Sequence, residues 1–336
     1  MNRLLGRSLT LFGHVLLASA CGGDRPATDI SGPSSATAPA ASATAAAKPK
    51  YRFAVIPKSL DLPVFNYAKV GAERAAAALG NVEIIWRAPE TADQLRQKEM
   101  LESFITQKVD GIAISCTNGD FLTETINKAV EAGIPVVTWD ADAPKSKRQA
   151  FYGVDDLASG KIMGEETAKL LGGKGTVAVI TSLGADNLRR RLDGVQEALK
   201  GHPGIKVVEV FDIKEDPVRC AEIIATATNK YPDLGAWISV GGWPVFTRNA
   251  LDPVDPARTK FVSFDTIPPA PDIMKAGKVQ VLIGQKYFGW GSEPVKILAD
   301  IKAGKPPAKA VVDSGVDVVT VANLAEYQEA WAKLEK

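Results

Sequence analysis

The sequence contains few of the residues on which nucleophilic and metal-dependent enzymes rely. Its 336 residues include two histidines, His14 and His202, and three cysteines. Zinc sites of cysteine and histidine, Ser-His-Asp triads and Cys-His pairs all need histidines that converge from separate elements. His14 lies in a segment that we expect to be removed, and His202 stands beside Pro203 in a turn. We therefore predict no metal and no cofactor; hydrolysis by a pair of carboxylates stays open.

An excess of one charge is also missing, as is a long apolar run in the main part of the chain. Lys and Arg number 40, against 39 Asp and Glu. The sequence has no basic stripe of the kind that binds nucleic acid, and after the N-terminal region it has no apolar stretch long enough to cross a membrane. We expect no nucleic-acid partner.

The N-terminal region is typical of an exported lipoprotein. Arg3 and Arg7 precede an apolar run over residues 9–18, and Ala18-Ser19-Ala20 lead into Cys21. Small residues before a cysteine suit lipoprotein signal peptidase, and the run is too short for a stable transmembrane helix. We predict a signal peptide over residues 1–20 and a lipid on Cys21. The protein would lie in the periplasm or on the extracellular face of the cell membrane. An ordinary secretory signal with an incidental cysteine is the alternative.

Residues 21–50 contain almost no large apolar side chain, so they cannot bury enough surface to fold. We predict a disordered tether whose attachment to the membrane is through the lipid anchor alone. The two later cysteines, Cys116 and Cys220, lie in apolar or helical patterns. We expect both to be small buried residues rather than a disulfide.

Residues 51–336 alternate β-rich runs with helical patterns. The predicted strands are 52–56, 82–86, 111–115, 135–139, 176–180, 206–210, 236–240 and 260–264, and the predicted helices between the first four are 65–79, 92–107 and 123–132. Repeated strand-helix-strand order implies parallel sheets with helices on both faces. About four units fall in each half of this range, so the predicted class is α/β with two doubly wound parallel-sheet lobes.

Ligands of open α/β sheets bind beyond the carboxyl ends of the strands, so the residues after each predicted strand are the candidates for a site. They are carboxylates, amides, cations and aromatics, which suit a neutral polyol, because hydroxyls donate to carboxylates, accept from Arg or Asn, and leave C–H faces to pack on rings. The candidates are Lys58, Asp61, Phe65, Asn118, Asp140, Trp243, Asp265, Gln285 and one residue of Arg189-Arg190-Arg191.

Several stretches stand in a characteristic order and spacing. They are LDLPVF at 60–65, QKVDGIAI at 107–114, AGIPVVTWD at 132–140, GVDD at 153–156 with GKIMG at 160–164, RLDG at 191–194, VSFD at 262–265 and IGQ at 283–285. By these stretches, residues 51–336 resemble the ribose-binding type of periplasmic sugar-binding proteins, the solute receptors of ABC importers. That family has the type I periplasmic binding protein fold, with a core like that of the lac repressor.

The resemblance implies a specific organisation and a set of partners. Three crossings near 153–156, 284–286 and 313–315 would form a three-strand hinge. Residues 51–154 and 286–313 would form the N-terminal lobe, and residues 155–285 and 314–336 the C-terminal lobe. A monosaccharide would be the ligand and a membrane-embedded ABC permease the partner of a monomeric receptor.

The resemblance also implies roles for particular residues. Asp140, Asp265 and Gln285 would hold sugar hydroxyls, Arg191 would reach in from the second lobe, and Phe65 would form an aromatic wall. The chain also departs from the family pattern, with Leu62 for a polar Asn, Val64 for a second aromatic, Ala141 for an arginine and Gly241 near the place of another Asn. Trp243 could supply a stacking surface where that Asn is missing.

Simpler interpretations stand beside these predictions. Asp140 and Asp265 could instead be N-caps of the helices that follow. Trp139 lies inside an apolar run and is expected in the core. Residues 172–175, GGKG, are similar to a phosphate loop but precede a strand, which disfavours nucleotide binding.

Three alternative functions follow from the same residues. A secreted carbohydrate-active enzyme could use a carboxylate pair such as Asp140 and Asp265. A sensory receptor could deliver its ligand to a chemoreceptor or sensor kinase. A lac-repressor-like regulator would need a DNA-binding head where this chain has an export signal.

Overall fold

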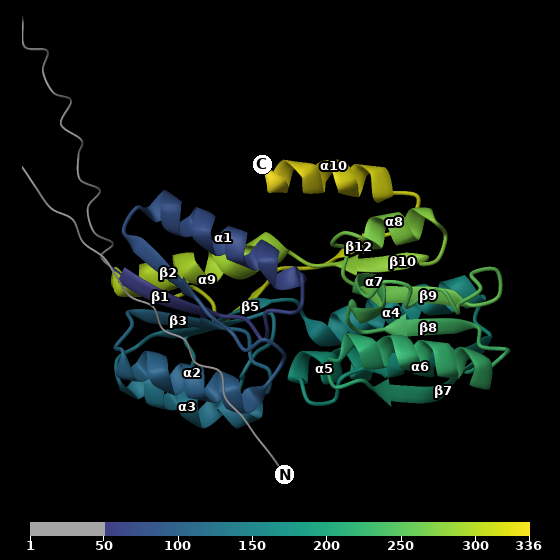
Figure 1. Ribbon diagram of the computed structural model, residues 1–336, viewed down its shortest axis with the longest axis horizontal. Coiled ribbons are helices and arrows are strands. Elements are labelled where there is room, and N and C mark those ends of the chain that lie inside the picture. The colour runs from purple at the N-terminus through teal and green to yellow at the C-terminus, as the bar shows by residue number, and fades with distance from the viewer. Residues whose placement is uncertain (1–50) are drawn as a thin grey trace, which may run out of the picture. The chain divides into compact units, whose positions relative to one another are not determined.

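The computed structural model describes residues 51–336, and within that range the chain forms two six-stranded sheets. The first has the strand order β11-β5-β4-β3-β1-β2, with every neighbouring pair parallel. Its strands are β1 (Tyr51–Ile56), β2 (Val82–Trp86), β3 (Gly111–Ile114), β4 (Val136–Trp139), β5 (Ala150–Gly153) and β11 (Val311–Asp313). In Figure 1, α1 (Val64–Leu79) and α9 (Tyr287–Lys302) cover one face of this sheet, and α2 (Gln94–Thr106) and α3 (Gly119–Glu131) cover the other.

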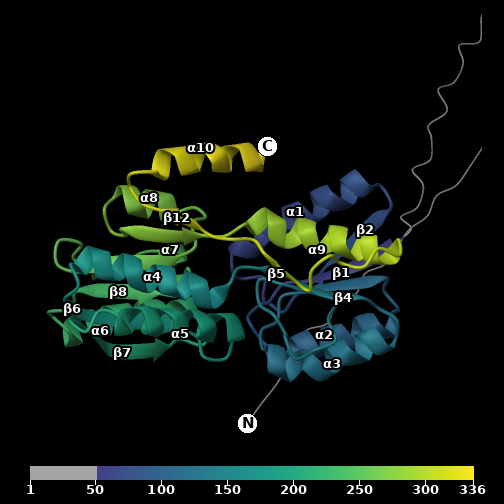
Figure 2. The ribbon, with the colours of Figure 1, turned by 180° about the vertical axis from the view of Figure 1, so that it is seen from behind.

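The second sheet has the order β12-β10-β9-β8-β6-β7 and is parallel except for its edge strand β12 (Asp317–Val319), which is antiparallel to β10. Its other strands are β6 (Gly175–Thr181), β7 (Ile205–Asp212), β8 (Ala236–Ser239), β9 (Lys260–Phe264) and β10 (Val281–Gly284). One face carries α4 (Asp156–Leu171) and α5 (Asp186–Lys200), which are in front in Figure 2. The other face carries α6 (Pro217–Lys230), α7 (Trp243–Phe246) and α8 (Ala270–Lys275).

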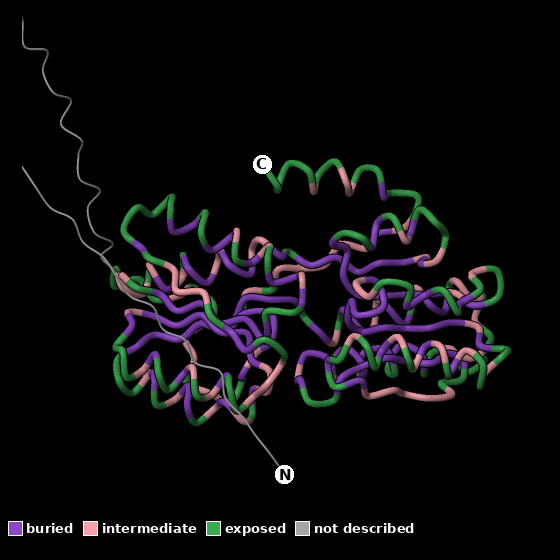
Figure 3. Tube along the Cα trace, in the orientation of Figure 1, coloured by how far each residue is buried: buried purple, intermediate pink, exposed green. Residues whose placement is uncertain are grey.

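Most side chains of the central strands are apolar and buried, because both faces of a parallel sheet are covered. In Figure 3 the central strands are largely buried, while the edge strands and the outer turns of the helices are partly or fully exposed. The eight predicted strands correspond to β1–β4 and β6–β9, and the three predicted helices to α1–α3. Helix α3 begins at Gly119, earlier than expected, because Asn118 caps it by accepting a hydrogen bond from the Phe121 N–H.

Within the described range the chain passes between the sheets at three places: from β5 to α4, from β10 to α9, and from β11 to β12. Two of these crossings are tied together, because the Asp313 carboxylate accepts hydrogen bonds from the backbone N–H groups of Asp155 and Gly315. The predicted α/β class, with two doubly wound lobes and a three-strand hinge, is confirmed. We call the part around the first sheet the N-terminal lobe and the part around the second the C-terminal lobe.

Two helix pairs pack so closely that glycine is required between them. A Cβ at Gly291 of α9 would lie 1.8 Å from the Ala68 carbonyl oxygen of α1. In the C-terminal lobe, a Cβ at Gly160 of α4 would lie 2.0 Å from the Arg191 carbonyl oxygen, and one at Gly194 of α5 would lie 2.1 Å from the Leu157 carbonyl oxygen. The α4–α5 contact therefore fixes the position of Arg191 relative to the N-terminus of α4.

The C-terminal helix α10 (Leu324–Glu335) follows β12 but packs on helices of the N-terminal lobe. Trp331 contacts the rings of Tyr67 in α1 and Phe288 in α9 at centroid distances of 5.0 and 5.7 Å. Arg74 of α1 donates hydrogen bonds to the last carbonyl groups of α10. Tyr327, one turn earlier, contacts Thr266 of the C-terminal lobe at 2.6 Å between hydroxyl oxygens. Helix α10 therefore contacts both lobes.

The predicted signal peptide, the lipidation site Cys21 and the predicted tether lie outside the described residues. Over residues 51–336, no helix is both long and apolar enough to cross a membrane. Cys116 and Cys220 are buried free thiols, and burial raises the pKa of the Cys220 thiol to about 12. Their predicted burial is confirmed.

Candidate functional site

Residues from the carboxyl ends of both sheets line one small cavity, which we call the central cavity. Asp140 directly follows β4, Asp265 directly follows β9, and Gln285 directly follows β10. Lys58 follows β1, and Arg191 lies in the second turn of α5. The other lining residues are Leu62, Val64, Phe65, Asn187, Leu188, Glu215, Gly241, Gly242, Trp243, Phe246 and Trp290. The rule that ligands bind beyond strand ends therefore locates this cavity.

Asp140 and Asp265 share an unusual backbone conformation. Their φ angles are 57° and 72°, in the left-handed region that non-glycine residues seldom adopt and that Asp tolerates better than most. Neither residue caps a helix, so the interpretation as N-caps is wrong; the side chains that cap the neighbouring helices are those of Asn118, Asp155 and Asp216. The turn at the end of each strand keeps the carboxylate beside the cavity.

The Arg191 guanidinium is buried and held on three sides. Its Nε donates to Asp156 Oδ1 at 2.8 Å, Nη1 to the Val240 carbonyl at 3.1 Å, and Nη2 to Gln285 Oε1 at 3.2 Å. Its Cζ lies 3.8 Å from the centroid of the Phe264 ring. A guanidinium has five N–H groups, so two of them are left for a ligand.

A second network holds Asp265. Its Oδ1 accepts hydrogen bonds from Gln285 Nε2 and the Tyr287 hydroxyl, both at 2.9 Å. Burial is the largest influence on Asp265 and raises its pKa, while the hydrogen bond from Gln285 acts in the opposite direction. The Tyr287 hydroxyl also contacts the Thr266 backbone N–H at 3.0 Å. Because Oδ1 is occupied, Oδ2 is the oxygen that can accept from a ligand.

Lys58 joins the two lobes across the cavity. Its Nζ donates to Asn187 Oδ1 at 3.2 Å and lies 3.5 Å from Glu215 Oε1. Lys58 belongs to the N-terminal lobe, whereas Asn187 and Glu215 belong to the C-terminal lobe. All three side chains are buried. On the N-terminal side the cavity also has Asp140, whose Oδ2 accepts from the Ser115 hydroxyl at 2.7 Å.

Aromatic rings form the apolar walls of the cavity. Phe65 lies edge-on to Trp139 and tilted against Trp290, at centroid distances of 5.7 and 6.1 Å. Across the cavity, Trp243 covers Gly241 so closely that a Cβ there would lie 2.6 Å from the indole. An Asn at position 241 itself would collide with this ring. Trp139 is fully buried beneath Phe65, which confirms its expected place in the core.

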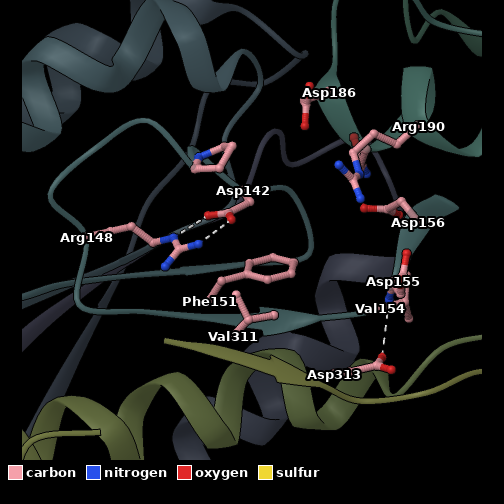
Figure 4. A pocket seen from close by; sticks show the side chains of 12 residues that line it. Asp142, Arg148, Phe151, Val154, Asp155, Asp156, Asp186, Arg190, Val311 and Asp313 are labelled. Atoms are coloured by element: carbon pink, nitrogen blue, oxygen red, sulfur yellow. Dashed lines mark hydrogen bonds and ion pairs between the residues drawn. The ribbon is translucent and has the colours of Figure 1, made fainter. Parts of the chain in front are cut away.

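The central cavity has a volume of about 40 Å³, well below the roughly 300 Å³ at which small-molecule pockets usually begin. Next to it lies a larger space of about 300 Å³, which we call the side cavity. In Figure 4, Asp142, Arg148 and Phe151 lie along one wall of the side cavity, and Asp156, Asp186 and Arg190 along the other. The Arg148 guanidinium donates twice to the Asp142 carboxylate at 2.6 Å. Asn187 lines both cavities.

The central cavity contains seven of the nine candidate residues, namely Lys58, Phe65, Asp140, Arg191, Trp243, Asp265 and Gln285. Their role in binding remains a prediction. Asp61 lies outside the cavity and is exposed, and its backbone N–H donates to the Glu90 carbonyl. Asn118 faces a neighbouring groove and its side-chain oxygen is used as the α3 cap.

Several lining or supporting residues have no counterpart among the candidates, and four of them are polar or aromatic side chains of particular interest: Asn187, Glu215, Tyr287 and Trp290. Asn187 stands one helical turn before Arg191, so the spacing along the helix could have identified it. Glu215 follows β7, which ends at Asp212. The predicted strand ended at Val210, so Glu215 was too far from its end to be considered a candidate. Tyr287 and Trp290 belong to α9, a helix that the sequence analysis did not predict.

The cavity is equipped for hydrogen bonding rather than for metal binding. No group of three or more His, Cys, Asp or Glu within residues 51–336 could hold a metal ion. The available groups are both acceptors and donors: carboxylate oxygens of Asp140 and Asp265, N–H groups of Arg191, and the Trp290 indole N–H, which has no partner among the described residues. Such a set matches a ligand that donates and accepts hydrogen bonds at several points.

Comparisons with known proteins agree with this arrangement. Residues 53–306 match a family model described as a periplasmic binding protein domain. The chain is 26% identical over 291 residues to the ribose import binding protein RbsB of Salmonella typhimurium, covering 83% of this chain and 94% of that protein.

Solved structures give similar results. An ABC transporter solute-binding protein from Burkholderia graminis, in complex with D-arabinose, is 30% identical with a TM-score of 0.78, over 83% of this chain and 98% of that one. A XylFII-LytSN complex contains a chain that is 26% identical with a TM-score of 0.75, over 82% of this chain and 98% of that one.

Proposed function

Because this chain belongs to the periplasmic binding protein family, with the type I fold, we propose that it is a receptor that encloses a monosaccharide in the central cavity. The observation that carries the proposal is the convergence of buried, incompletely used polar groups from both lobes between aromatic walls. Asp140 and Phe65 come from the N-terminal lobe, and Arg191, Asp265 and Trp243 from the C-terminal lobe. A pentose, a hexose or a close derivative fits this chemistry.

Each group has a defined task in this proposal. Asp140 and Asp265 accept hydrogen bonds from ligand hydroxyls, and the free N–H groups of Arg191 donate to ligand oxygens. Phe65 and Trp243 pack against the C–H faces of the ring. Lys58 and Gln285, already engaged with neighbouring side chains, donate their remaining N–H groups.

Ligand entry requires a change of shape, since the central cavity is too small for a sugar. The three crossings between the lobes provide a hinge about which the lobes can separate and close. The ligand then stabilises the closed population because residues of both lobes bind it together. The mechanism is binding coupled to closure, without bond chemistry.

We further propose that the receptor delivers its ligand to the permease of an ABC importer, in accord with the ribose import and ABC transporter relatives. It would work as a monomer, with the N-terminal lobe formed by residues 51–154 and 286–313 and the C-terminal lobe by residues 155–285 and 314–336. A lipid on Cys21 and a tether over residues 21–50 would hold it in the periplasm or at the extracellular face of the cell membrane, where sugars are captured.

A sensory role is the second candidate. It is favoured by the similarity to a chain of the XylFII-LytSN complex, in which XylFII is bound to a second component. The transport and sensory roles differ in the partner that recognises the closed receptor: a permease for the first, and a chemoreceptor or sensor kinase for the second. A secreted enzyme is disfavoured, because the relatives are binding proteins; an enzyme would convert the sugar, whereas a receptor returns it unchanged.

The test is a thermal-shift screen of the mature protein against pentoses, hexoses and alditols, followed by calorimetry, product analysis and solution scattering. We expect at least one sugar to raise the melting temperature, to be recovered unchanged and to make the protein more compact. Failure of every sugar to bind would overturn the proposal. A tightly bound sugar that left the scattering curve unchanged would overturn the closure mechanism.

A further inference from the structure

The two cations at the central cavity are both already paired. Arg191 lies against Asp156 at 2.8 Å, and Lys58 lies 3.5 Å from Glu215. The Asp140 and Asp265 carboxylates are instead held by neutral donors. Asp140 accepts from the Ser115 hydroxyl. Asp265 accepts from the Gln285 side-chain amide and the Tyr287 hydroxyl. A ligand in this cavity therefore meets two carboxylates whose charge is not offset by an ion pair.

Glu215 occupies its place at a structural cost. It lies in the loop between β7 and α6, where both Lys214 and Glu215 have φ angles in the left-handed region, 55° and 57°. The helix that follows is capped by Asp216, so Glu215 has no part in starting it. Burial raises the pKa of Glu215, and Lys58 acts in the opposite direction. The strained loop brings a carboxylate to the one lysine that faces the cavity.

We infer that Glu215 determines specificity: by pairing with Lys58 across the cavity, it removes the cation that could receive an anionic ligand and restricts the site to polyols without negative charge. This inference rests on the proposed sugar-binding function. Uncharged sugars and alditols are the ligand class, amino sugars are tolerated, and uronic acids and sugar phosphates are rejected. Like charges brought together in a buried site oppose binding strongly.

The experiment compares matched ligands by calorimetry. The probes are D-galactose, D-galactosamine and D-galacturonate; D-glucose, D-glucosamine and D-glucuronate; and D-ribose with ribose 5-phosphate. For the neutral sugars that bind the native protein, we expect the anionic derivative to bind about 100-fold more weakly or worse, and the amino derivative to lose far less. This ratio on the native protein tests the inference even if a variant fails to fold.

The variant Glu215→Gln leaves Lys58 unpaired. We expect the affinity for the anionic derivative, relative to that for its neutral parent, to rise about tenfold or more. The double variant that also carries Lys58→Gln should lose that gain. Glu209→Gln is the matched control, because this substitution removes the same charge outside the cavity. Glu209 lies on β7 and accepts hydrogen bonds from Lys230 and Tyr231. The control variant should leave the ratio unchanged.

The outcomes separate the two proposals. If a uronic acid or the phosphate binds the native protein as tightly as its neutral parent, the inference is wrong and the sugar-binding function stands. An unchanged ratio in folded Glu215→Gln also overturns the inference. If neither these probes nor any pentose, hexose or alditol of the screen binds, the proposed function fails and the inference fails with it.

Discussion

Arg191 Nε donates a hydrogen bond to Asp156 Oδ1 across 2.8 Å, and both side chains are buried. Asp156 is the first residue of α4, and Arg191 lies in α5, so the pair joins the helices that cover one face of the C-terminal sheet. The same guanidinium reaches Gln285 at the crossing from β10 to α9. The orientation of Arg191 in the central cavity is therefore fixed by the hinge region as well as by its own helix.

Arg191→Ala should weaken sugar binding by about 2 to 4 kcal/mol, because a ligand oxygen and the buried Asp156 both lose a charged partner. Calorimetry with the sugar identified by screening measures the change. Arg189→Ala is the control, since Arg189 binds Asp186 and the Leu183 carbonyl away from the central cavity. Equal affinities in the two variants would remove Arg191 from the site.

The stability contributed by Asp156 should depend on pH. Burial is the largest influence and raises the pKa of Asp156 from 3.8 to about 7, while Arg191 opposes the shift. A carboxyl whose pKa is higher in the folded state binds its proton more tightly there. Its contribution is complete below about pH 4 and is lost as the pH rises toward 7.

The measurement is urea unfolding of the native protein and Asp156→Asn at several pH values between 4 and 7.5. The stability of the native protein relative to the variant should fall with rising pH, by no more than about 4 kcal/mol in total. The opposite slope would mean that attraction to Arg191 outweighs burial and that the pKa of Asp156 is lowered in the folded protein.

Gly160→Ala should disturb both stability and binding. The added Cβ would lie 2.0 Å from the Arg191 carbonyl oxygen, so α4 and α5 must move apart. We expect a loss of about 1 to 3 kcal/mol in the free energy of unfolding, together with weaker sugar binding. Gly184→Ala is the matched control, because a Cβ there meets no atom within 4 Å. Normal binding by Gly160→Ala would show that the spacing of these helices does not set the position of Arg191.

Local sequence patterns account for much of the fold. Strands such as β3 and β8 are short buried runs of mostly apolar residues, a pattern that is enough to predict a buried parallel strand. The strands β11 and β12 were not predicted, because three residues carry too little periodicity, and the four-residue strand β5 was missed as well. The N-terminus of α3 was placed late, and the cap at Asn118 identifies its start better than the apolar spacing does.

The site was predictable where a strand ends and less so elsewhere. Asp140, Asp265 and Gln285 follow their strands directly, so they reach the cavity with no further information. Asp61 also follows a strand, but it is exposed in a loop whose backbone contacts Glu90, and no local pattern distinguishes it from its buried neighbour Leu62. Glu215 depends on a left-handed loop, and no local pattern in the sequence encodes where that loop points.

Cys21→Ser should release the protein from the membrane fraction and leave sugar affinity unchanged. Serine cannot accept the thioether-linked lipid, and Cys21 is not among the residues that line the central cavity. Fractionation with and without detergent, and calorimetry on the soluble variant, test both statements. Detergent-sensitive membrane association of the serine variant would contradict the predicted lipid anchor.

Tryptophan emission should report ligand binding. Trp243 and Trp290 line the central cavity and are buried, one in each lobe. A sugar that packs against Trp243 changes the environment of its indole when the lobes close. We expect a spectral change that saturates with the bound fraction measured by calorimetry.

Trp243→Leu should remove much of that change and weaken binding by about 1 to 3 kcal/mol, the scale of a lost aromatic contact. Closure at saturating sugar should persist, because Asp140, Arg191 and Asp265 remain to join the lobes through the ligand. Trp86→Leu is the control: Trp86 packs on Trp139 away from the cavity lining, so the variant should keep both affinity and the ligand-induced change. Native affinity in Trp243→Leu would show that Trp243 only covers Gly241 and does not stack on the ligand.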